Sequence, residues 1–273
     1  MIKRRVFLPI LLIAVICSSV LFNSCSDDEV TTAPPPAVTQ DLIFLDTAYA
    51  IGGRALVSIY VEDTLKVGYN NVYIVLHDSV TGATITNAHI TFKLTDHGIG
   101  TPVENPDEDA VDGKFKGAWI LNESQVSDNS LHWRDSIFVH NHQAPGEPEG
   151  AATFGGFRVK ENPDGFREIT MPDSTQLYLS QILPKTPKNG LNDFELIINR
   201  NEIGYAPDGS YTITVNPVYL SDGHTTTNNV NPVGTSNGHY YGKLNFDRSG
   251  LWRVNMNVTK NGMHYDTYFD MTY

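Results

Sequence analysis

The run GLNDFELII at residues 190–198 decides the fold, because the run GYNNVYIVL at residues 68–76 repeats its pattern. Each run begins with a glycine and an asparagine, which favour a turn, and continues with the apolar residues of a β-strand. Two further landmarks recur in the same order at nearly the same spacing: GKFKG at 113–117 returns as GHYYG at 238–242, and LHWR at 131–134 returns as LWR at 251–253. The chain therefore contains two copies of one unit.

Short segments rich in Val, Ile, Thr, Tyr and Phe alternate with Gly, Pro, Asn and Asp turns, and no stretch holds a helical period. This pattern predicts an all-β protein of two tandem Ig-like antiparallel β-sandwiches. The proline- and glycine-rich run at 145–150 predicts the boundary, with one sandwich at 41–148 and the other at 151–273. Trp133 and Trp252 are the predicted core anchors.

Composition excludes several classes of function. The 273 residues carry 19 Lys and Arg against 31 Asp and Glu, so no excess of positive charge is present to bind nucleic acid. Two cysteines cannot build a disulfide scaffold or a four-cysteine zinc site. The chain also lacks a P-loop, a GxGxxG run and an HExxH motif, and we expect no enzymatic activity.

The first 24 residues have the pattern of an export signal. Three basic residues at 3–5 precede an apolar stretch at 6–22, and Ser24 is a small residue before a cleavage point. The alternative is a transmembrane helix, but the apolar stretch is shorter than the roughly 20 residues that a span requires. The run LFNSC at 21–25 then resembles a bacterial lipoprotein lipobox. The resemblance implies that Cys25 carries lipid, including palmitate.

Residues 25–40 form a predicted tether, with an acidic run at 26–29 and a proline-rich run at 31–36. An acidic run after the lipidated cysteine resembles a signal that sends some lipoproteins to the outer face of the outer membrane. The expected location is the cell envelope, anchored to the outer membrane by lipid and exposed at the surface. The expected partners are the membrane, through the lipid anchor, and a protein of the envelope.

The order of the landmarks resembles the YtkA-like/FixH-like family, most clearly over residues 190–273 and more loosely over 60–140. The resemblance implies small extracytoplasmic Ig-like β-sandwiches, which are often linked to copper handling. The related loops are often methionine-rich, whereas neither matching loop of this chain contains methionine. Thioether sulfur selects Cu(I), so this difference argues against a Cu(I) role.

Four histidines are candidate metal ligands: His97, His140, His142 and His224. Residues i and i+2 of a strand point to one face, so His140 and His142 can place two imidazoles on one ion. His97 and His224 occupy corresponding loops beside an aspartate and a glycine. The alternatives are that His140 and His142 are solvated at a strand end without a ligand, and that His97 and His224 are local hydrogen-bond donors beside their turn glycines. The sequence predicts no resident cofactor, and at most a weak copper or zinc site.

The favoured interpretation is a non-enzymatic envelope lipoprotein that presents two Ig-like domains for binding or scaffolding. The alternative is an extracytoplasmic metal-handling protein, with copper as the expected metal, that uses the loop histidines. An enzyme is the third and least supported choice.

Overall fold

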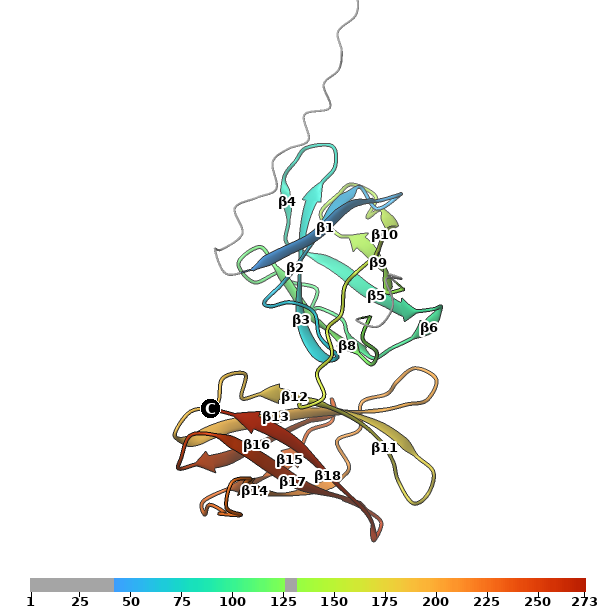
Figure 1. Ribbon diagram of the computed structural model, residues 1–273. Helices are drawn as coiled ribbons and strands as arrows, with labels where there is room; N and C mark the ends of the chain where they lie inside the picture. Colours follow the sequence, from blue (N-terminus) through green and yellow to red (C-terminus); the bar gives the residue numbers. More distant parts are fainter. Residues whose placement is uncertain (1–41, 126–131) are drawn as a thin grey trace, which may run out of the picture. The chain divides into compact units, whose positions relative to one another are not determined.

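The computed structural model describes residues 42–125 and 132–273. These residues form two Ig-like β-sandwiches, and every pairing between named strands is antiparallel (Figure 1). Within the described residues, no helix is long and apolar enough to cross a membrane. The predicted signal at 1–24, the tether at 25–40 and Cys25 lie outside the described residues.

The first sandwich packs a six-stranded sheet against a four-stranded sheet. The larger sheet has the order β1 (Ile43–Ala50), β2 (Ala55–Val61), β3 (Gly68–Asp78), β8 (Phe115–Leu121) and β7 (Val103–Glu104), with β4 (Thr84–Ile85) beside β3. The smaller sheet has the order β10 (Glu149–Gly155), β9 (Arg134–Asn141), β5 (Ala88–Asp96) and β6 (Ile99–Gly100).

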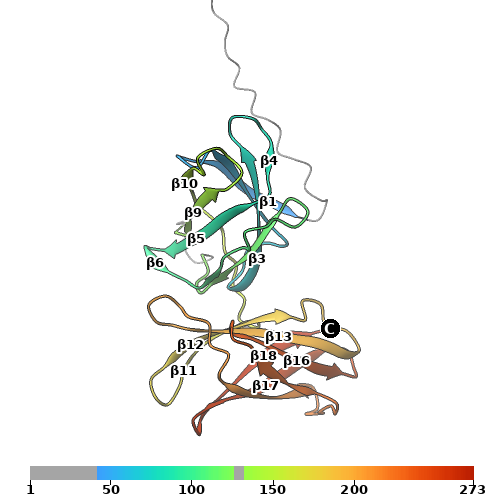
Figure 2. The same ribbon diagram turned by 180° about the vertical axis from the view of Figure 1, so that it is seen from behind.

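The second sandwich packs a five-stranded sheet against a three-stranded sheet (Figure 2). The larger sheet has the order β11 (Phe166–Thr170), β12 (Gln176–Leu183), β13 (Gly190–Arg200), β16 (His239–Phe246) and β15 (Val230–Gly234). The smaller sheet has the order β14 (Thr212–Tyr219), β17 (Leu251–Lys260) and β18 (Met263–Thr272). Strand for strand, this order repeats that of the first sandwich, with β4 and β6 as the additions in the first.

The asparagine of each Gly-x-Asn run makes the same set of hydrogen bonds at the start of its strand. Asn70 accepts a hydrogen bond from the Lys66 amide at 3.0 Å and donates to the Lys66 carbonyl at 2.7 Å. Asn192 accepts from the Lys188 amide at 2.8 Å and donates to the Lys188 carbonyl at 2.7 Å. Each side chain therefore satisfies both backbone groups of a turn residue, which fixes how the chain enters β3 and β13.

A second asparagine joins the two sheets of each sandwich. Asn105 accepts a hydrogen bond at 2.9 Å from the amide of Phe92 in β5, and Asn231 accepts one at 2.9 Å from the amide of Val215 in β14. The pairing registers make Phe92 and Val215 equivalent positions when Trp133 is aligned with Trp252. The Asn-Pro pairs that recur in the sequence therefore have one structural role.

The last glycine of each Gly-x-aromatic-x-Gly run lies under a neighbouring strand. A Cβ atom at Gly117 would lie 2.5 Å from the Glu104 carbonyl oxygen and 2.6 Å from the Phe92 ring. A Cβ atom at Gly242 would lie 2.6 Å from the Val230 carbonyl oxygen. Only glycine permits these close backbone approaches.

We expect Gly117→Ala to lower the free energy of unfolding of the first sandwich by about 1–3 kcal/mol, because the added methyl group must displace backbone. Gly155→Ala is the control. Its Cβ would lie 3.3 Å from the flexible Arg134 side chain and 3.7 Å from the nearest backbone atom, the Trp133 carbonyl oxygen. Urea unfolding of both variants measures the difference. Equal stability of the two variants would show that the strand shifts without cost.

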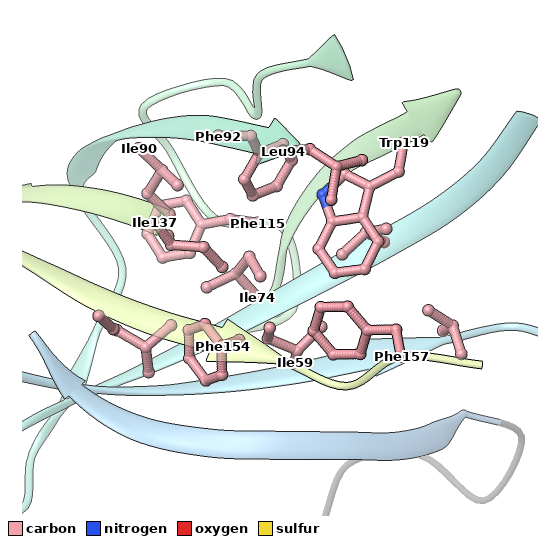
Figure 3. Packing of buried hydrophobic residues seen from close by; sticks show 14 of the residues in the cluster. Ile59, Ile74, Ile90, Phe92, Leu94, Phe115, Trp119, Ile137, Phe154 and Phe157 are labelled. Carbon is pink, nitrogen blue, oxygen red and sulfur yellow. The ribbon is translucent and has the colours of Figure 1, made fainter. Parts of the chain in front are cut away.

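Each sandwich has its own hydrophobic core, and the two clusters of buried residues share no member. Trp133 lies in the first core and Trp252 in the second, and both are 0% exposed. The first core holds another fully buried tryptophan, Trp119, which the sequence analysis did not single out. Figure 3 shows ten labelled residues of this core: Ile59, Ile74, Ile90, Phe92, Leu94, Phe115, Trp119, Ile137, Phe154 and Phe157.

The boundary predicted between 148 and 151 is wrong. The run at 145–150 connects β9 to β10, and β10 pairs with β9 from Glu149 to Gly155. Phe154, Phe157 and Val159 belong to the first core, so the first sandwich continues at least to residue 159. Proline and glycine mark a turn within one domain here, because a hairpin turn and a linker favour the same residues.

Candidate metal centre

Four side chains with metal-ligating chemistry meet at one end of the first sandwich. Asp96, His97 and His132 place one ligand atom each within 4.8 Å of one another. The carboxyl group of Glu123 lies close enough to that of Asp96 to have its pKa raised by it. We call these four residues the Asp96 cluster.

The strand ends explain how the chain brings these residues together. Asp96 is the last residue of β5, and its backbone pairs with Ile99 of β6. His97 begins the turn between them with a φ of 47°. On the other side, the buried indole of Trp133 donates a hydrogen bond at 3.2 Å to the carbonyl of Glu123. The buried Trp133 therefore positions Glu123 through this hydrogen bond, and it positions His132 because His132 is the preceding residue in the chain.

The cluster combines a buried carboxylate with exposed His97 and Glu123 and half-buried His132. Asp96 is 8% exposed, and its Oδ1 atom has no hydrogen-bond partner. The Asp96 carboxyl group, together with burial, raises the pKa of Glu123. The rings of His97 and His132 lie face to face, with centroids 3.5 Å apart and planes inclined by 35°. One carboxyl group and two imidazoles thus converge, and the carboxyl group of Glu123 lies beside Asp96.

A second group lies at the hairpin that joins β9 and β10. The rings of His140 and His142 have centroids 4.4 Å apart, and Glu147 lies 3.7 Å from His140 and 3.9 Å from His142. His140 is in β9, but the strand ends at Asn141, so His142 lies in the turn rather than on the same strand. The side chains of His140 and His142 are 33% and 26% exposed, and the Nε2 atom of His142 is buried without a hydrogen-bond partner.

His224 has different surroundings from His97. Its Nε2 atom lies 2.7 Å from Asp247, and its ring meets the Trp252 ring edge-on at 6.2 Å. The hydrogen bond from His224 lowers the pKa of Asp247, with the nearby Arg248 guanidinium contributing further. Within the described residues, His224 belongs to no group of three converging ligands. The corresponding loops of the two sandwiches therefore differ in chemistry.

The structure brings the four predicted histidines into three separate places. His97 joins Asp96, Glu123 and His132, none of which the sequence analysis proposed as ligands. The one sequence feature that could have identified His132 as a ligand was its position next to Trp133, a residue of a repeated run. Residues 96 and 132 are far apart in the chain, however, and only the pairing of β5 with β9 shows that they meet.

No protein-family model matches the chain, and no curated protein matches it. Among solved structures, domains 5–6 of the S-layer protein SbsC are similar at 10% identity and a TM-score of 0.29, over 84% of this chain and 97% of that one. The Escherichia coli adhesin FdeC is similar at 16% identity and a TM-score of 0.26, over 84% of this chain and 65% of that one. The D00-D0 domain of intimin is similar at 10% identity and a TM-score of 0.25, over 80% of this chain and 100% of that one. The fold described above rests on the strand order and register of the chain itself.

Proposed function

We propose that the chain is a non-enzymatic lipoprotein of the bacterial cell envelope that presents two Ig-like sandwiches for binding or scaffolding. The observation that carries this proposal is the pair of separate, complete cores that follow a cysteine and a proline-rich stretch. Sandwiches that follow a predicted proline-rich tether suit display away from a membrane. The proposed location is the outer membrane, with the sandwiches exposed at the surface.

The first test of this proposal is whether Cys25 carries the lipid anchor. Each buried CH₂ of an acyl chain contributes about 0.8 kcal/mol, so two or three chains hold a protein firmly. We expect Cys25→Ala to abolish labelling by radioactive palmitate and to move the protein from the membrane fraction to the soluble fraction.

Cys17→Ala is the matched control, because it removes the only other cysteine from within the predicted signal. Labelling should persist in this variant. A labelled Cys25→Ala protein, or loss of the label in Cys17→Ala alone, would refute the assignment of the anchor.

Extracytoplasmic metal handling is the second candidate function, because both groups of converging ligands contain histidines that the sequence predicted. Their ligand atoms are imidazole nitrogens and carboxylate oxygens. These ligands suit divalent ions such as Zn²⁺ or Cu²⁺ rather than Cu(I). Of the two groups, the Asp96 cluster contains the more deeply buried ligand.

A further inference from the structure

We infer that the Asp96 cluster binds one divalent transition-metal ion, with Zn²⁺ as the ion that its ligands fit best. Two imidazole nitrogens and one or two carboxylate oxygens form a ligand set that Zn²⁺ accepts. Hard ions such as Ca²⁺ and Mg²⁺ prefer oxygen ligands alone. This inference rests on the second candidate function, metal handling, and does not depend on the lipid anchor.

The spacing of the ligand atoms is close to that of a bound ion. Zn–N bonds are about 2.0–2.1 Å and Zn–O bonds about 2.0–2.2 Å, so two ligands of one ion lie at most about 4.3 Å apart. The ligand atoms of Asp96, His97 and His132 lie within 4.8 Å of one another. The remaining difference is about 0.5 Å, and His97 is exposed and free to rotate, whereas Asp96 is buried at the end of β5.

The second, independent observation is the unpartnered oxygen of Asp96. A buried polar atom without a partner costs free energy, and a buried carboxylate costs more unless a cation compensates it. Within the described residues, no Lys or Arg forms an ion pair with Asp96, and the carboxyl group of Glu123 lies beside it. A divalent cation at this point supplies the missing partner for Oδ1 and offsets both carboxylates.

The second sandwich shows that the fold does not require these residues. Strand register and the shared indole hydrogen bond identify the equivalent positions, which hold Tyr219 for Asp96, Leu220 for His97, Leu251 for His132 and Arg248 for Glu123. The second sandwich forms the same strand ends without any of the ligands. The three converging side chains, with Glu123 beside them, are therefore a property of the first sandwich alone, and an ion explains why they are of the ligating type.

The test is calorimetric titration of metal-stripped residues 37–273, which contain both complete cores, with Zn²⁺ alone. We expect one ion per chain at this site. Asp96→Asn and His97→Asn should each weaken binding at least about tenfold. Asparagine keeps the size of Asp96, and it tolerates the positive φ at position 97. Circular dichroism shows whether each variant is folded. If Asp96→Asn unfolds, His97→Asn still tests the site, because His97 is exposed and its replacement leaves the core intact.

The double variant His140→Ala, His142→Ala is the matched control, because it removes the other histidine pair and leaves the Asp96 cluster intact. Binding that survives in this variant and weakens in His97→Asn supports the inference. Absence of Zn²⁺ binding, binding lost only in the His140/His142 variant, or displacement of Zn²⁺ by excess Ca²⁺ would each overturn it. Residues 37–273 lack Cys25, so failure of the anchor and failure of the metal site are distinguishable.

Discussion

Replacing Trp252 with alanine should lower the free energy of unfolding of the second sandwich by about 3–5 kcal/mol. The side chain is fully buried, and its ring packs against Tyr219 and Phe246 with centroid distances of 5.3 Å in both cases. Its indole also donates a hydrogen bond at 2.9 Å to the Arg248 carbonyl. The substitution removes both the packing and this hydrogen bond. The expected loss is a large fraction of the total free energy of unfolding of a typical domain.

Urea unfolding followed by circular dichroism measures this effect. Trp252→Phe is the control, because it keeps an aromatic ring in the cavity and removes the indole N–H, so its loss should be smaller. A change of less than about 1 kcal/mol in Trp252→Ala would contradict the assignment of Trp252 as a core anchor.

The second large effect concerns Asp135, which is 0% exposed in the first core. Its Oδ1 accepts a hydrogen bond at 2.9 Å from the Lys93 amide, while Oδ2 and the nearby Trp119 indole N–H are both buried without a hydrogen bond of regular geometry. Burial raises the pKa of Asp135 to about 7, against the opposing effect of its hydrogen bonds. The folded state therefore binds this proton more tightly than the unfolded state.

The sign of the pH dependence follows from that difference. Between pH 3.8, the ordinary pKa, and about pH 7, the folded state holds more protons, so this group makes stability fall as the pH rises. Above pH 7 the full cost of ionising the buried Asp135 lowers the free energy of unfolding, by on the order of 4 kcal/mol. Asparagine cannot ionise and still accepts from Lys93, so Asp135→Asn should be more stable than the native chain above pH 7 and equally stable near pH 4.

Thermal unfolding between pH 4 and pH 8 makes the comparison. Asp193→Asn is the control, since Asp193 lies at an exposed position and should bring no gain at high pH. An Asp135→Asn protein that is less stable than the native chain at pH 8 would show that the ionised carboxylate has a compensating partner.

The repeated runs predicted the fold because each records a local constraint on the backbone. Asn70 and Asn192 each satisfy a turn, and Gly117 and Gly242 each lie against a neighbouring strand. Such constraints survive when core residues change, so they remain visible as short motifs. The two tryptophans were predicted for a similar reason, because few positions in a sandwich accommodate an indole.

The domain boundary and the ligand cluster were less accessible from the sequence. The run at 145–150 has the residues of a linker, and only the pairing of β9 with β10 shows that it is a hairpin. The cluster depends on contacts between strand ends that are distant in the chain, and the key residue, Asp96, has no motif of its own. Its burial and its unpartnered oxygen exist only in three dimensions.

The shared strand order also bears on how the chain avoids misassembly. Tandem domains with the same topology can exchange equivalent strands while they fold. By register, Asp135 of β9 is equivalent to Val254 of β17, which is fully buried in the second core. Insertion of β9 into the second sandwich would bury a carboxyl group where valine packs, so Asp135 disfavours the wrong pairing while costing stability in the right one.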